Sequence, residues 1–178
     1  MAFCRTYIQQ LSFDGINYSK GSVVELFDTF GVVCRDIPFR MWPERKELPT
    51  RDWPERDGVD VYIPRTIPMK PYDIDVKFLF VGDKTDIRDN ISDFIKFIYG
   101  RNNGATGGRL AIYNEHTGMG RKDVVVSKVQ DELFFLSDED PDCVAQFSVT
   151  FTVHDPVTDV NPQSSMVNGN SVITDLFF

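Results

Sequence analysis

The sequence predicts a mainly β fold, a sandwich or barrel of antiparallel strands with one α-helix packed on it at about residues 85–99. Fifteen Phe residues and a high content of Val and Ile favour strands. A long segment toward the end of the chain alternates apolar and polar residues, as a half-buried strand does. Only one segment has apolar residues at helical spacing. With 178 residues, 42% of them hydrophobic, the chain is long and apolar enough for one domain with a real core.

Strand patterns account for most of the chain. Residues 5–40 are expected to form strands, with turns at Asp14-Gly15 and Lys20-Gly21. The alternation is clearest over residues 72–81 and 143–153. The residues expected to face the core are Ile74, Val76, Phe78 and Phe80 in the first segment, and Cys143, Ala145, Phe147, Val149, Phe151 and Val153 in the second. Further strands are expected at 59–63, 109–113, 122–129 and 132–136.

The helix signal lies just after residues 72–81. Its apolar residues recur at i, i+4, i+7, i+8 and i+11, which is one helical face: Ile87, Ile91, Phe94, Ile95 and Ile98. Asp83 or Thr85 is expected to cap its start, and Gly100 to end it. Burying five such side chains contributes roughly 8–15 kcal/mol before entropy is subtracted, so the helix is expected to pack on the sheet.

Residues 41–58 differ from the rest of the chain. They contain three prolines and many charges and show no periodicity, which predicts a long loop of functional importance. The tetrapeptide WPER occurs in it twice, at Trp42–Arg45 and Trp53–Arg56, and we interpret the two copies as the two feet of one protruding loop. Trp and Arg are frequent anchors of protein interfaces, so Trp42, Arg45, Trp53 and Arg56 are candidate subunit-interface residues. The alternative is that the indoles fold back over their own sheet edge.

The C-terminal segment is expected to be separate from the β-rich domain. Residues 1–156 are predicted to form that single domain, and residues 157–178 an extended arm. The arm ends in the apolar stretch SVITDLFF, so Phe177 and Phe178 are further interface candidates, docking either back on the domain or on a neighbour.

Composition and motifs argue against several function classes. The formal charge of −8 is unfavourable for nucleic-acid binding, which needs clustered Lys and Arg. No apolar run is long enough to span a bilayer, so no membrane association is expected, and the N-terminus lacks a signal-peptide pattern. The two His residues and three Cys residues are not at metal-ligand spacing. No catalytic or cofactor-binding motif is present. We therefore expect no enzyme activity, catalytic residues, metal or cofactor.

The order of these elements resembles the N-terminal ring domain of phage distal tail proteins and, more loosely, the tail-tube and type VI secretion tube proteins. The resemblance covers about residues 7–156 and rests on pattern and order, without one diagnostic motif. It is carried by LSFDGINYS, PERDGVDVYIP, YDIDVKFLFVG, IRDNISDFIKFIYG, GGRLAIYNEHTGMGRKDVVVSKV and CVAQFSVTFTVHDP.

The resemblance implies a tail-tube-like fold and a structural role in a phage or prophage virion. Such proteins form a hexameric ring, a baseplate hub that joins the tail tube to the tail-tip protein and leaves a central channel for DNA. The loop 41–58 corresponds to the family's loop that contacts neighbouring subunits or rings. The implied partners are therefore further copies of the chain, the tube and the tail-tip protein. Genome DNA passes through the lumen without specific binding, and assembly takes place in the bacterial host cytoplasm.

One departure from the family concerns the end of the chain. Many distal tail proteins carry a second, carbohydrate-binding-like domain, whereas this chain ends soon after its last predicted strand, so no host-sugar-binding role is expected.

Three alternatives stay open at this point. The chain is a tail-tube subunit of a phage or type VI-like contractile system, or a monomeric glycan- or peptide-binding module in which Trp42 and Trp53 stack on a ligand. The third is a small enzyme using carboxylates such as Glu115, Asp138 and Asp140, which the sequence alone does not bring together.

Overall fold

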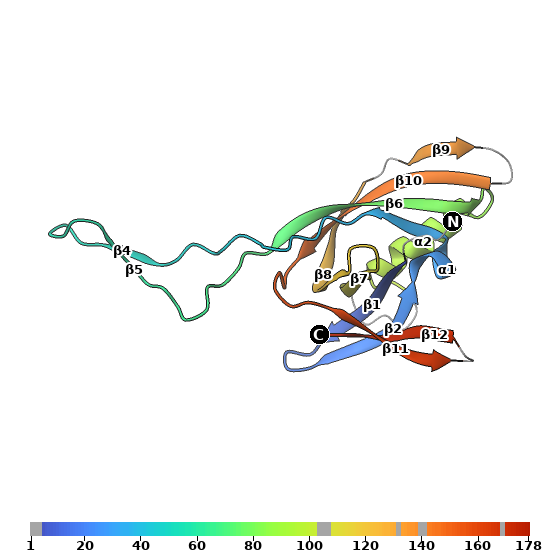
Figure 1. Ribbon diagram of the computed structural model, residues 1–178. Coiled ribbons are helices and arrows are strands. Elements are labelled where there is room, and N and C mark those ends of the chain that lie inside the picture. The colour runs from blue at the N-terminus through green and yellow to red at the C-terminus, as the bar shows by residue number, and fades with distance from the viewer. Residues whose placement is uncertain (1–4, 103–107, 131–132, 139–141, 168–169) are drawn as a thin grey trace.

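The computed structural model confirms a mainly β fold, with 54% strand and 11% helix. It describes the whole chain except residues 1–4, 103–107, 131–132, 139–141 and 168–169. One large antiparallel sheet has the order β2-β1-β7-β8-β10-β6-β3, and β9 pairs with β10 (Figure 1). Its strands are β1 (Thr6–Phe13), β2 (Tyr18–Glu25), β3 (Val32–Asp36), β6 (Tyr72–Asp83), β7 (Arg109–Asn114), β8 (Met119–Val129), β9 (Phe134–Asp138) and β10 (Asp142–Val153).

Helix α2 (Ile87–Ile98) packs on one face of this curved sheet (Figure 1). Phe94 lies at the centre, fully buried, with its ring against those of Phe78 on β6 and Phe147 on β10 at 5.1 and 5.9 Å between centroids. The predicted inward residues of β6 and β10 are all buried in this core. The helix ends at Ile98 with Tyr99 as its C-cap, and Gly100 follows in the left-handed conformation, at a φ of 66°, as a terminating glycine does. The N-cap is Asp86 instead of Asp83 or Thr85, and its side chain makes no capping hydrogen bond.

Residues 5–40 are not all strand. A short helix, α1 (Leu26–Phe30), interrupts them, and the carboxylate of Glu25 caps it by accepting the Asp28 N–H at 2.7 Å. Gly31 closes α1 in the left-handed conformation, at a φ of 65°. The expected turn at Lys20-Gly21 lies inside β2, where the pairing with β1 shifts register. Bulges of this kind let glycine fit without breaking a strand.

The opposite face of β1 and β7 is covered by the C-terminal segment. Instead of an extended arm, it contains β11 (Asn161–Val167) and β12 (Asn170–Phe177), which pair antiparallel and lie beside β2 (Figure 1). Its docking creates a second, smaller core, and the fully buried side chain of Leu176 belongs to it. The buried members of that core are Tyr7, Leu11, Ala111, Val160 and Leu176.

Asp175 holds the C-terminal hairpin to the sheet. Its carboxylate accepts hydrogen bonds from Gln9 Nε2 at 3.0 Å and from Lys20 Nζ at 3.1 Å. Burial alone disfavours the ionised form, but these donors outweigh it and lower the pKa of Asp175 below its ordinary value of 3.8. A carboxyl group with a lowered folded-state pKa stabilises the fold above its unfolded pKa. That contribution is lost as the pH falls through the folded pKa.

Asp175→Asn is therefore expected to destabilise the protein at pH 7 by about 1 kcal/mol, a modest amount because solvent reaches the pair. The difference from the unmodified protein should shrink as the pH falls below 3.8, the ordinary pKa. Thermal unfolding of both proteins at pH 7 and at strongly acidic pH measures it. A difference that is the same at both pH values would contradict this role for the ionised carboxylate.

Candidate interaction surface

Between β3 and β6 the chain leaves the body as a long ribbon, residues 41–71, which we call the arm (Figure 1). Near the body, Lys46 N–H donates to the Pro68 carbonyl at 2.8 Å and Lys70 N–H to the Glu44 carbonyl at 2.7 Å. Farther out, β4 (Thr50–Asp52) pairs with β5 (Val59–Val61) in an antiparallel hairpin. The predicted loop 41–58 is thus the outgoing side and the tip of this longer, two-stranded arm.

The arm has no core of its own. None of the described buried hydrophobic residues lies within it. A lone two-stranded hairpin is marginally stable in water, and many exposed apolar side chains gathered on one segment commonly mark an interaction site. Its exposed large hydrophobic side chains are Met41, Trp42, Trp53, Val59, Val61, Tyr62, Ile63 and Ile67.

Trp53 lies at the tip of the arm and is held there by neighbours on one face of the hairpin. The Arg51 guanidinium stacks on its ring at 3.7 Å, and its indole N–H donates to the Asp60 carboxylate at 2.9 Å. Arg56, in the turn, lies 3.9 Å from the same carboxylate. These contacts present the indole, 38% exposed, in a defined orientation.

The other face of the hairpin carries a bare apolar strip. Val59 and Val61 are two residues apart on β5, so they point to the same side of the strand, and Ile63 follows two residues beyond it. Their side chains are 52%, 47% and 69% exposed. Across the hairpin, Asp52 is opposite Val59, and Thr50 is opposite Val61. The alternation VDVYI predicts a strand at 59–63, which the structure shows over Val59–Val61. The pattern does not distinguish an apolar face that meets the body from one that faces solvent.

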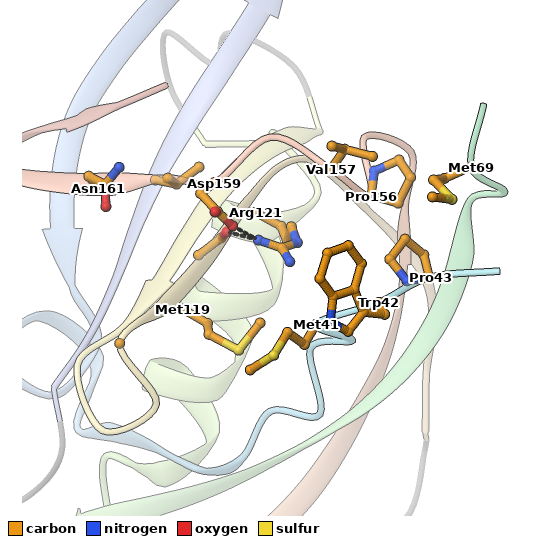
Figure 2. Close-up of a pocket in the computed structure, with 13 residues that line it drawn as sticks. Met41, Trp42, Pro43, Met69, Met119, Arg121, Pro156, Val157, Asp159 and Asn161 are labelled. Carbon is orange, nitrogen blue, oxygen red and sulfur yellow. Dashed lines mark hydrogen bonds and ion pairs between the residues drawn. The ribbon is translucent and has the colours of Figure 1, made fainter. Parts of the chain in front are cut away.

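At the base of the arm lies a cavity of about 460 Å³ (Figure 2). Trp42, 82% exposed, lies over it, and Met41 and Met69 come from the two sides of the arm. The rest of the wall includes Met119 of β8 and, on the segment that leads to the C-terminal hairpin, Pro156, Val157, Asp159 and Val160. Met side chains repack easily around different surfaces, so this base is suited to contact a partner or to let the arm change direction.

Arg121 fixes the base of the arm to the body. Only 3% exposed, its guanidinium donates to the Asp159 carboxylate and, at 3.1 Å, to the Arg40 carbonyl (Figure 2). It therefore joins β8, the start of the arm and the segment before the C-terminal hairpin. Its Nε has no partner among the described residues. Nothing in the sequence distinguishes Arg121 from the surface arginines, because its role depends on contacts distant in the chain.

The structure separates the residues predicted to act together. Trp42 lies at the base of the arm and Trp53 at its tip, so the two WPER copies are not the two feet of the loop. Arg45 is exposed on the outgoing side, opposite Met69. Phe178 docks on its own body, with its ring 5.5 Å from that of Tyr18, between the ammonium groups of Lys20 and Lys122. Phe177 is 63% exposed.

The shifted carboxyl groups have structural explanations. Burial raises the pKa of Glu25, the residue that caps α1. Turn N–H groups that follow Asp14 and Asp83 donate to these carboxylates and lower their pKa values. Of the carboxylate set considered from the sequence, Glu115 is exposed and Asp140 lies outside the described residues. In the part of the chain that the structure describes, no cluster of three or more His, Cys, Asp or Glu side chains is placed to hold a metal ion.

Neither a family model nor a curated protein matches the chain. Within the described residues no helix is long and apolar enough to cross a membrane. The functional argument therefore rests on the sequence resemblance and on the arm.

Replacing Trp42 and Trp53 together by Ala is expected to weaken self-association by a few kcal/mol per interface, the effect of losing two aromatic anchors. The thermal midpoint of the monomer should change little, because Trp42 is almost fully exposed and Trp53 contacts only the arm. Light scattering across a concentration series, with a thermal scan of the same samples, measures both quantities. A sharp fall in the midpoint would show that the indoles stabilise the fold itself.

Proposed function

We propose that this protein is a structural subunit of a phage or prophage tail, a distal tail or baseplate hub protein that assembles into a hexameric ring around a DNA channel. The proposal combines the sequence resemblance with an observation independent of it. That observation is the arm, a ribbon with no core whose apolar side chains are exposed on the isolated subunit. A surface of this kind gains stability only when another molecule covers it.

The charge distribution is compatible with this role. The arm contains six acidic and six basic residues, so the formal charge of −8 belongs to the remainder of the chain. A neutral arm can approach the acidic body of another copy without net repulsion. An acidic body that faces a channel repels DNA phosphates, which lets a genome pass without binding.

One end of the large sheet supplies a further contact for a ring. Among the described residues β3 ends the sheet, and its outer edge pairs with no strand of this sheet. Neighbouring subunits commonly cover such edges. At the other end, β12 of the C-terminal hairpin lies beside β2. A ring uses two different patches of each subunit, one meeting the other on the next copy, and an arm that meets a distant receiving surface satisfies this requirement.

Size-exclusion chromatography with light scattering, from low to high micromolar concentration, tests the proposal. A discrete species with the mass of six chains is the expected result, and negative-stain images should show an annulus. Long tubes of stacked rings would identify a tail-tube subunit instead. A strict monomer that binds a glycan or peptide through Trp42 and Trp53 would replace the proposal by the monomeric binding module.

A further inference from the structure

A second apolar surface lies on the body, between α2 and β9. It is a groove of about 590 Å³, and its floor contains the buried side chains of Ile87 and Phe147. Ile91 and Ile95 of α2 line one wall and are half-buried. The other wall includes Leu133, which is 39% exposed, and Phe135 of β9, which is 51% exposed. Both walls thus offer apolar area to a partner.

The spacing of this groove fits the apolar strip of the arm. Ile87, Ile91 and Ile95 are four residues apart on a helix that rises about 1.5 Å per residue, so they repeat every ~6 Å. Val59, Val61 and Ile63 are two residues apart on an extended strand, which also repeats every ~6.6 Å. The strip can therefore lie in register with the helix, against the half-buried Ile91 and Ile95 and above the buried Ile87.

The charges of the two surfaces are complementary. Arg88 and Lys96 are the charged residues that line the groove in the described part of the chain, and both are basic. Lys96 Nζ is already paired with the Asp93 carboxylate at 2.8 Å, so Arg88 is the groove cation that carries the charge argument.

On the arm, Asp52 lies opposite Val59 on the face of the strip. The basic residues Arg51 and Arg56 are engaged with Trp53 and Asp60 on the other face. A carboxylate on the strip placed against a basic rim fixes orientation and favours encounter.

The strip and the groove of one molecule lie at opposite ends of the same strand. The arm joins β6 at Tyr72, which pairs with Val153 of β10. The groove lies near the other end, where Ala145 of β10 pairs with both Phe80 of β6 and Phe135 of β9. The outgoing side of the arm, at ~3.3 Å per residue, extends roughly 40 Å away from the body. The arm therefore points away from the groove of its own molecule, and its strip is directed toward another copy.

We infer that the groove between α2 and β9 receives the apolar strip of the arm of a neighbouring copy, with Val61 against Ile91 at the centre of the contact. This inference rests on the proposed ring and identifies its receiving surface. The contact is heterologous because strip and groove are different patches, and repetition of it generates a ring or a helical stack.

A mixed cysteine cross-link tests the contact. Val61→Cys and Ile91→Cys are made in separate chains of different length. Both chains also carry Cys4→Ser. Cys34 and Cys143 are kept because they are buried. A disulfide forms only where the two Cβ atoms come within about 4.5 Å. Mild oxidation of the mixture should give a heterodimer on a non-reducing gel. Tyr62→Cys with Ile91→Cys is the matched control, since Tyr62 points to the opposite face, and it should give little. Leu133→Cys replaces Ile91→Cys if that variant does not fold.

Charge reversal is the second test. Arg88→Glu with Lys96→Glu should raise the concentration needed for assembly severalfold, and adding Asp52→Lys should recover part of the loss, because the opposite charges then meet again. If the unmodified protein forms rings but the cross-link is absent or equals the control, the groove assignment is wrong and the proposed function stands. A monomer at every concentration, without cross-linking, overturns both.

Discussion

Shortening the arm is expected to abolish ring formation and to leave a folded, monomeric body. The variant replaces residues 46–68 by a short Gly-Ser loop. It keeps the pairing of Arg45 with Met69 and the 2.7 Å hydrogen bond from Lys70 N–H to the Glu44 carbonyl. Every described core residue lies outside the deleted segment, so the free energy of unfolding should be nearly unchanged. Loss of the strip and of Trp53 removes several kcal/mol from each interface, and about 4 kcal/mol corresponds to a thousandfold weaker contact.

A full-length control separates the apolar strip from the mere presence of the arm. Val59→Thr, Val61→Thr and Ile63→Thr together keep β-branched side chains, and hence the strand preference of the hairpin, while removing most of its apolar surface. This variant should also be monomeric by light scattering, with an unchanged thermal midpoint. Hexamers that persist in both variants at the same concentration as in the unmodified protein would show that the arm does not hold the ring together.

Much of the body could be predicted from the sequence because its patterns are local and regular. The strands β6 and β10 alternate over most of their length, so periodicity alone places their inward side chains. On α2 the period places Ile87, Phe94 and Ile98 in the core, but the predicted Ile91 and Ile95 are only half-buried, and Phe97, outside the predicted face, is buried. The helix α1 escaped prediction because five residues are too few to show a helical period. Its hydrophobic residues Leu26, Phe27 and Phe30 continue the composition of the strands around them.

The surface was less predictable than the core, for a physical reason. Prolines and charges identified a loop, but an alternating strand such as β5 looks the same whether its apolar face meets its own body or another molecule. The separation of Trp42 from Trp53 depends on where the hairpin turns, and that is set by the pairing of β4 with β5. The docking of Leu176 and the contacts of Arg121 join segments far apart in sequence, for which one sequence carries no signal.

Phe94→Ala is expected to be the most destabilising single substitution considered for this protein. The side chain is fully buried, and its ring meets those of Phe30, Phe78 and Phe147. Removing such a ring leaves a cavity and typically costs 3–5 kcal/mol, a large share of the 5–15 kcal/mol that stabilises a domain. Because the free energy of unfolding falls by 1–3 kcal/mol per molar urea, the urea midpoint of unfolding should fall by about 2 M.

Phe135→Ala is the matched control, because it deletes the same ring from a side chain that is 51% exposed. It should shift the urea midpoint of the monomer little, since no core cavity forms, yet it removes part of the groove wall and should therefore weaken assembly. Phe94→Ala should act through folding: α2 carries Ile91 and Ile95, so loss of its anchor loosens the receiving groove as well. Equal shifts of the urea midpoint in the two variants would contradict the placement of α2 against the sheet. A buried anchor beneath an exposed docking groove predicts two different effects. Phe94→Ala should mainly lower the stability of the monomer, and Phe135→Ala should mainly weaken association.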